Sequence, residues 1–129
     1  MASLPFSISV YAGLAKANGL VRQDGNALVL EFEIQDRALG MLRSDLKELR
    51  VPIQDIEQIS LKTNWFRPPR LVVQTGTMRI SRQVPGSRHG TFELTIDHDH
   101  RLVAKNLISR VENFKSNGAA SPKEPAALE

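Results

Sequence analysis

Residues 101–118 read RLVAKNLISRVENFKSNG, and this stretch decides the fold. Its apolar side chains recur with the 3.6-residue period of an α-helix and form one stripe: Val103, Leu107, Ile108, Val111 and Phe114. Asp97 or Asp99 can cap the first turn, and Asn117-Gly118 predicts the end of the helix. Each large apolar side chain contributes about 1.5–3 kcal/mol when it is fully buried, so the stripe must pack against an apolar surface. The sequence therefore predicts a C-terminal helix that closes one end of a sheet.

The residues before this helix alternate between apolar and polar side chains, which is the pattern of half-buried β-strands. Strands are predicted at 19–23, 28–34, 49–53, 59–65, 71–75, 78–80 and 92–96. Asp24-Gly25 predicts a hairpin turn between the first two of them. Residues 6–11 alternate as well, so an additional N-terminal strand is left open. Trp65 has the phase of Ile59 and Leu61 and is expected in the core.

The length of 129 residues fits one domain. We divide it into an N-terminal segment at 1–16, a folded domain at 17–116 and a disordered tail at 117–129, whose last two residues resemble the remnant of a cloning site. The chain has no cysteine, no apolar run near the roughly 20 residues needed to span a bilayer, and no signal-peptide pattern at its start. These features predict a cytoplasmic protein without a transmembrane segment.

Charge is distributed unevenly along the chain. Between Asp24 and Glu57 there are eight acids and four bases, whereas 60–90 holds six bases and no acid. Two interpretations stay open. Either the acidic and basic halves neutralise each other across adjacent strands, or the basic half forms a binding surface.

The order of strands followed by one helix, together with residues 51–59 (VPIQDIEQI) and 70–73 (RLVV), resembles the pleckstrin-homology-like (PH-like) superfamily, in its bacterial single-domain form. The resemblance covers 17–116. It implies a mainly β fold, a partly open barrel of seven strands in two nearly orthogonal antiparallel sheets, capped by a C-terminal α-helix. A different small barrel or sandwich with a terminal helix would share much of this pattern.

Members of this superfamily that bind phosphoinositides have a basic signature in the first hairpin, where a lysine is followed by two basic residues that flank one position. The corresponding segment is predicted here at 19–31, where Arg22 is the only base after Lys16. Recognition of a multiply phosphorylated head group needs several converging charged donors. The resemblance therefore does not carry specific phosphoinositide binding to this chain.

The loop at 85–90 is the first candidate site, because two glycines allow unusual backbone geometry beside a hydroxyl, a guanidinium and an imidazole. An anion or a lipid head group is the predicted ligand. The candidate residues are Arg79, Arg82, Ser87, Arg88 and His89. The alternative is an ordinary surface loop.

Residues 65–70 (WFRPPR) form the second candidate site, because aromatics beside arginines are typical of interface hot spots and membrane surfaces. Phe66 is expected to point away from the core, and with Arg67 and Arg70 it is the candidate partner interface. The partner would be another protein, a second copy of the chain or a bilayer surface.

Other chemistry is disfavoured. His98 and His100 are two residues apart and cannot chelate a metal from one face of a helix. No nucleophile–base spacing or cofactor fingerprint is present, so neither a metal nor a cofactor is predicted and the chain is expected not to be an enzyme. Nucleic acid ranks last because aromatic platforms and a docking motif are missing.

The predicted function is a non-catalytic interaction domain that binds a protein or itself, with weak binding to anionic phospholipids as the alternative.

Overall fold

The fold was obtained as a computed structural model, which describes residues 3–10, 15–36 and 46–120. In chain order, the strands and helices of this part are β1 (Leu4–Val10), β2 (Ala15–Asp24), β3 (Ala27–Asp36), β4 (Lys47–Pro52), the 3-10 turn η2 (Ile53–Asp55), β5 (Ile56–Asn64), β6 (Arg67–Thr75), the short helix α1 (Met78–Ser81), β7 (Thr91–Thr95), the 3-10 turn η3 (His98–His100) and the long helix α2 (Arg101–Ala120).

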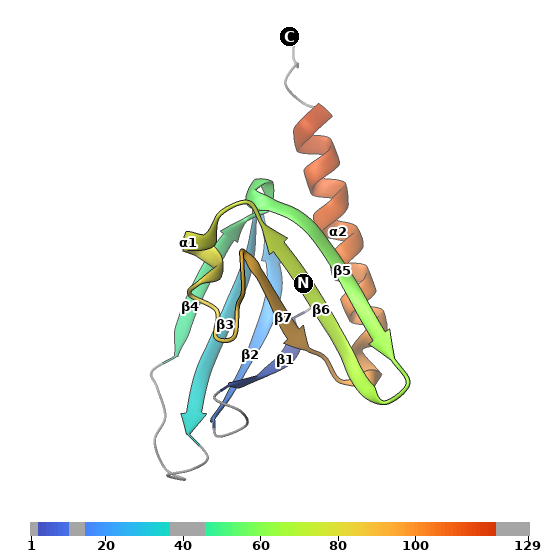
Figure 1. The fold of residues 1–129 in the computed structure, drawn as a ribbon. Coiled ribbons are helices and arrows are strands. Elements are labelled where there is room, and N and C mark those ends of the chain that lie inside the picture. The colour runs from blue at the N-terminus through green and yellow to red at the C-terminus, as the bar shows by residue number, and fades with distance from the viewer. Residues whose placement is uncertain (1–2, 11–14, 37–45, 121–129) are drawn as a thin grey trace.

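The strands form one antiparallel sheet in the order β4-β3-β2-β1-β7-β6-β5. β4 and β5 lie at opposite ends of this order, so the sheet is not closed (Figure 1). β1 pairs along its length with β2, but its register with β7 consists of one pair, Ser7 with Thr95. This thin connection divides the sheet into two halves. The prediction of a mainly β, partly open barrel with a C-terminal helix is confirmed.

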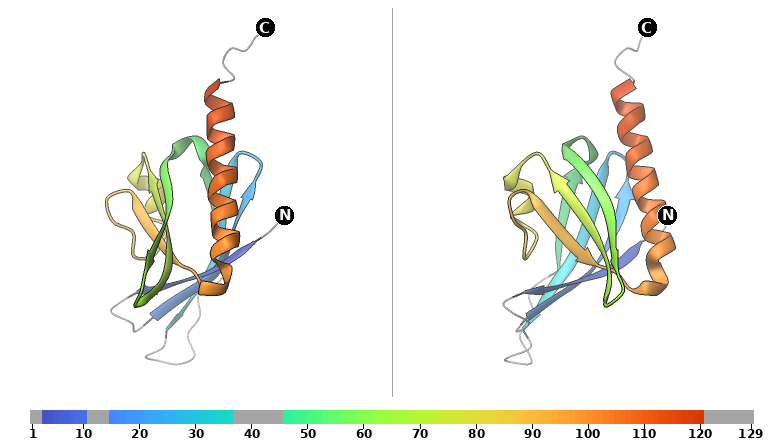
Figure 2. Two further views of the ribbon diagram at one scale, coloured as in Figure 1. Left: turned by 90° about the vertical axis from the view of Figure 1, so that its right-hand side faces the viewer. Right: turned by 45° about the vertical axis from the view of Figure 1, so that its right-hand side comes forward.

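Helix α2 packs against β5, η2 and β2, and Figure 2 shows it standing between the two halves of the sheet. Ala104, Leu107 and Val111 are buried, and Val103, Ile108 and Phe114 pack partly buried against the same core. The predicted apolar stripe is therefore confirmed as the face that closes the sheet.

The two ends of this helix differ in how well the sequence predicts them. Asp97 caps η3 as expected, because its Oδ1 accepts a hydrogen bond from the N–H of Asp99 at 2.9 Å. The helix does not stop at Asn117-Gly118 but runs to Ala120. A glycine lowers helix propensity by only about 1 kcal/mol, which is too little to end a helix by itself. Residues 121–129 of the predicted tail lie outside the described residues.

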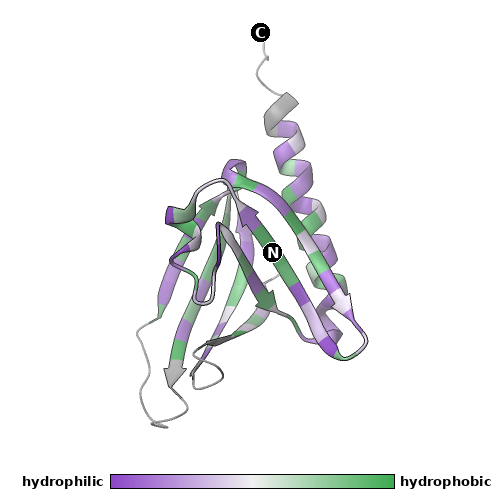
Figure 3. Ribbon diagram, viewed as in Figure 1, coloured by the Kyte–Doolittle hydropathy of each residue, from purple (hydrophilic) through white to green (hydrophobic). Residues whose placement is uncertain are grey.

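The strands alternate in hydropathy along much of their length (Figure 3), and the hairpin turns follow from the sequence. The β2–β3 turn has two residues, and Gly25 adopts a φ of 60° at its first position, which a residue with a side chain would resist. Val29 departs from the alternation, since it is buried although it faces away from the main core. Its cross-strand neighbours are Arg22 and Arg50, whose aliphatic stems can cover it.

Two features of the predicted strand set are corrected. Residues 78–80 belong to α1 instead of a strand, because the Thr77 side chain caps a helical turn by accepting from the N–H of Arg79 at 3.2 Å. The strand left open at the N-terminus is present as β1, and it lies in the middle of the sheet. The folded unit thus reaches back to Leu4, past the expected boundary at 17. The hairpin at 19–31 is consequently the second of the chain, β2–β3, and not the first.

Candidate functional site

Four arginines gather around two adjoining depressions on the outer side of β1, β6 and β7. The first has a volume of about 700 Å³ and is lined by Ile8, Ser9, Arg67, Arg70, Pro85, Gly86, Arg88, Thr91, Glu93 and Thr95. The second has about 520 Å³ and is lined by Ser9, Ile34, Arg82, Gln83, Pro85, Gly86, Ser87 and Arg88. They share Ser9, Pro85, Gly86 and Arg88, and we call them together the arginine groove.

A tight turn in the β6–β7 connection holds Arg88 in place. Arg88 and Thr91 exchange two main-chain hydrogen bonds of 2.8 Å, and the two residues between them, His89 and Gly90, both have positive φ, at 52° and 83°. This is the geometry of a type I′ hairpin turn. Thr75 of β6 anchors it by donating its main-chain N–H to the carbonyl oxygen of Gly90 at 2.8 Å. The Arg88 side chain therefore leaves from a backbone position that is fixed on both sides.

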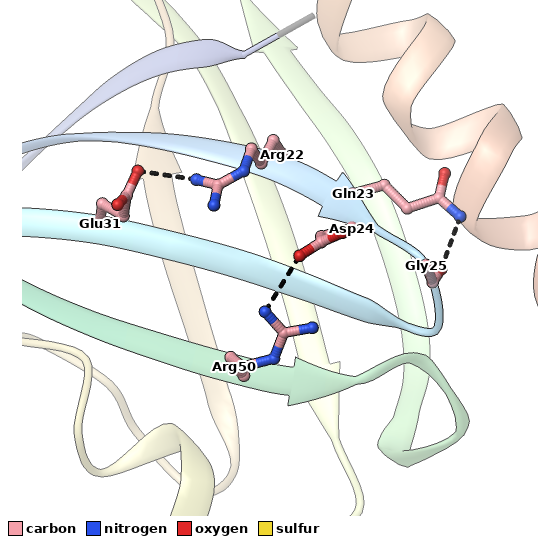
Figure 4. Close-up of polar contacts among 6 residues, drawn as sticks. All are labelled: Arg22, Gln23, Asp24, Gly25, Glu31 and Arg50. Atoms are coloured by element: carbon pink, nitrogen blue, oxygen red, sulfur yellow. Dashed lines mark hydrogen bonds and ion pairs between the residues drawn. The ribbon is translucent and has the colours of Figure 1, made fainter. Parts of the chain in front are cut away.

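The charge of the groove is largely uncompensated. Three ion pairs join described residues: Arg22 to Glu31 at 2.7 Å, Arg50 to Asp24 at 3.1 Å, and Arg70 to Glu93 at 2.8 Å (the first two in Figure 4). Within the part of the chain that the structure describes, Arg67, Arg82 and Arg88 have no ion-pair partner.

The ion pairs given for residues 3–10, 15–36 and 46–120 do not join the acidic half of the sequence to the basic half. None of the three ion pairs joins an acid of 24–57 to a base of 60–90. The reason is topological, because β4 and β5 follow one another in the chain but occupy opposite edges of the sheet. Among the described residues, Arg70 is the one base of 60–90 that has an ion-pair partner, and this partner is Glu93.

The two candidate sites of the sequence partly merge. Arg82, Ser87 and Arg88 line the groove, and they are joined there by Arg67 and Arg70, which the sequence assigned to a separate interface. Arg79 on α1 and His89 in the turn are exposed and line neither depression. Ser9 was missed, and no local signal could have found it, because it belongs to β1 and reaches the groove through strand pairing. The alternation of the last predicted strand could have placed Thr91 and Thr95 on its outward face, which is the face that lines the groove.

Two aromatic side chains stand fully in solvent at the β5–β6 turn. Trp65 is 96% exposed and Phe66 is 94% exposed. The prediction for Phe66 is confirmed, and that for Trp65 is wrong. The strand ends at Asn64, and Asn64 pairs with Arg67 after a shift in register, so Trp65 falls in a two-residue turn and loses the inward phase of Ile59. We call Trp65 and Phe66 the aromatic tip.

Metal and membrane-spanning signals were sought in the same part of the chain. The described residues contain no cluster of three or more histidine, cysteine or acidic side chains placed to hold a metal ion. His98 is exposed, and His100 is half-buried with a Nδ1 atom that has no hydrogen-bond partner. No helix within residues 3–10, 15–36 and 46–120 is both long and apolar enough to cross a membrane.

No family model matches the chain, and no curated protein and no solved structure is significantly similar to it. What the chain binds must therefore be inferred from the geometry of its own residues.

Proposed function

We propose that this chain is a non-catalytic binding module whose arginine groove takes a phosphate group, carried by an anionic phospholipid or by a small soluble compound. One observation carries the proposal. Arginines from separate segments converge on the groove, Arg67 and Arg70 from β6 and Arg82 and Arg88 from the β6–β7 connection. The one carboxylate that lines it, Glu93, pairs with Arg70 and leaves the other three arginines available.

The chemistry of the groove suits a phosphate. A guanidinium presents a planar fork of donors that matches two phosphate oxygens, and charge-assisted bonds of this kind are about twice as strong as neutral ones. The hydroxyls of Ser9, Ser87 and Thr91 add neutral donors around the same space. Apolar enclosure, which small organic ligands usually require, is limited here to Ile8, Ile34 and prolyl carbons.

A protein partner ranks first from sequence but receives less support from this geometry. Hot spots of protein interfaces combine arginine with aromatic anchors, and none of the residues that line the groove is aromatic. One of the two edge strands, β4, carries Lys47, Glu48, Arg50 and Pro52, which are residues that discourage strand addition. Protein binding is therefore kept as an alternative that the experiment below can detect.

Two further assignments belong to this proposal. The order of the strands, the thin β1–β7 connection and the C-terminal helix support membership of the PH-like superfamily. A cytoplasmic setting is supported by the absence of cysteine, and it would give the groove access to the anionic inner leaflet.

The test compares charge reversal in the groove with charge reversal elsewhere. The variant Arg82→Glu/Arg88→Glu reverses the charge of two of the groove's three unpaired arginines, and Lys105→Glu/Arg110→Glu changes net charge equally on exposed positions of α2. Inorganic phosphate is titrated by NMR, and sedimentation is measured with phosphatidylcholine vesicles with and without phosphatidylserine. We expect shifts of the groove amides with phosphate, and sedimentation with anionic vesicles that falls about tenfold or more in the groove variant and weakens with salt.

The outcomes separate the sources of phosphate. Phosphate shifts without vesicle binding identify a soluble ligand, and vesicle binding that depends on Arg82 and Arg88 identifies a lipid. Absence of both at low salt, or equal effects of the two variants, contradicts the proposal. If a defined protein binds in a manner that depends on Arg88, and neither phosphate nor anionic vesicles bind, the chain is a protein-binding module instead.

A further inference from the structure

The aromatic tip is an unusual feature for a surface turn. Of the large apolar side chains that the structure describes as exposed, Trp65 and Phe66 are the two most exposed, at 96% and 94%, and they are adjacent. Among the described residues, neither aromatic belongs to the hydrophobic core or to the partly buried side chains that pack against it. Their exposure has no stabilising role in the isolated fold, which points to a surface that covers them.

The backbone of the tip is restrained, and one of its main-chain donors is satisfied by a side chain. The Asn64 side chain accepts a hydrogen bond from the N–H of Phe66 at 3.0 Å, and Pro68 and Pro69 restrict the backbone at the start of β6. A turn that enters an apolar medium must satisfy its own polar groups, because no water is available there. The Asn64 bond meets this need for one donor, and the restraint that the prolines place on the backbone lowers the entropy lost when the aromatics are buried.

The charge around the tip is positive. The hairpin from Lys62 to Arg70 carries three cations and no acid. At the base of the turn, Trp65 lines a shallow depression with Thr63, Asn64, Pro69, His98 and Arg101. The neighbouring η3 turn contributes two carboxylates, Asp99 within the turn and Asp97 as its N-cap. Each cation near an anionic leaflet strengthens binding about fivefold, so this arrangement complements a bilayer surface that carries negative charge.

We infer that the aromatic tip inserts into the interfacial region of an anionic lipid bilayer, while Lys62, Arg67 and Arg101 contact its head groups. Tryptophan favours this region because one part of its ring system is apolar and its N–H can stay hydrated. The inference deepens the proposed function, on which it rests for the class of ligand, by naming the bilayer as the source of phosphate. Arg67 belongs both to the tip's flank and to the arginine groove, so the two surfaces are continuous.

Trp65 is the only tryptophan of the chain, so its fluorescence reports on the tip without labelling. We expect the emission of a hydrated indole in buffer and with phosphatidylcholine vesicles. With vesicles that also contain phosphatidylserine, we expect a blue shift and quenching by lipids brominated along the acyl chain. In sedimentation, Trp65→Ala/Phe66→Ala should lower partitioning by about tenfold or more, because two aromatic side chains lose their burial. Met78→Ala, at an exposed apolar residue on α1, should leave it unchanged.

The inference is overturned if anionic vesicles sediment the protein while Trp65 stays hydrated and the double variant binds normally. If the vesicle binding seen in that case still depends on Arg82 and Arg88, the proposed function of the arginine groove is retained. The converse result is that Trp65 inserts equally well in the Arg82→Glu/Arg88→Glu variant. It would support insertion of the aromatic tip and contradict phosphate binding by the arginine groove. A blue shift that needs no vesicles and grows with protein concentration identifies self-association and also overturns the inference. Circular dichroism of each variant checks that it is folded.

Discussion

Gly19 lies in β2 between two aromatic residues, with Phe6 opposite it on β1 and Phe32 opposite it on β3. A Cβ atom placed on Gly19 would stand 2.1 Å from the carbonyl oxygen of Glu31 and 2.7 Å from the Cβ of Phe32. These are backbone and near-backbone atoms that cannot turn aside. The close approach of two strands at this point therefore depends on the missing side chain.

We expect Gly19→Ala to destabilise the domain by about 2–3 kcal/mol, because the strands must separate to admit a methyl group. Chemical denaturation gives the free energy of unfolding. Gly76→Ala is the matched control, since its nearest neighbour is the flexible end of Glu57 at 3.2 Å. Equal stability of the two variants would contradict the close packing at Gly19.

Trp65 shows the limit of residue-level reasoning. Its phase in the strand predicts burial, but one shift in register at the end of β5 places it in the turn. The period of a strand is two, so a single irregular residue reverses the direction of every later side chain. A β-bulge has no dependable sequence signal, and for that reason the sequence could not place Trp65.

At the scale of elements, α2 has a buried face and an exposed face that the sequence distinguishes well. Leu107 is 5% exposed and packs in the core, whereas Leu102 in the same helix is 70% exposed. Both have the same side chain and the same helix propensity. The difference between them is tertiary burial alone.

Leu107→Ala should therefore lower the free energy of unfolding by about 2–5 kcal/mol, and Leu102→Ala by less than about 0.5 kcal/mol. Thermal or urea unfolding of the two variants provides the comparison. If both lost the same small amount, α2 would not be a structural part of the core, and truncation before Leu107 would then leave a cooperative fold.

At the scale of the whole molecule, β1 joins the two halves of the sheet. Leu4, Phe6 and Ile8 are all buried in the core, and β1 is the strand that links β2 to β7. Sequence alone assigned these residues to an optional strand before a domain at 17–116. Their central position gives a direct way to test the architecture.

A chain that lacks residues 1–16 should show no cooperative unfolding transition, because the two halves lose both their connection and three large core side chains. A chain that lacks only residues 1–3 keeps all of β1 and should unfold normally. Differential scanning calorimetry separates these outcomes. A cooperative transition in the shorter chain would show that 17–116 is a complete domain after all.

The sequence by itself determined the class of fold, the apolar face of α2, a carboxylate cap at Asp97 or Asp99, the β2–β3 turn and the acid-free stretch at 60–90. These depend on periodicity, on capping and on the need of glycine for positive φ, which are interactions between residues near each other in the chain. Only the tertiary structure decided the position of β1, the exposure of Trp65 and the union of Arg67 and Arg70 with Arg82 and Arg88. Strand order and register bring distant segments together, and they are set by how the whole core packs, so no local pattern records them.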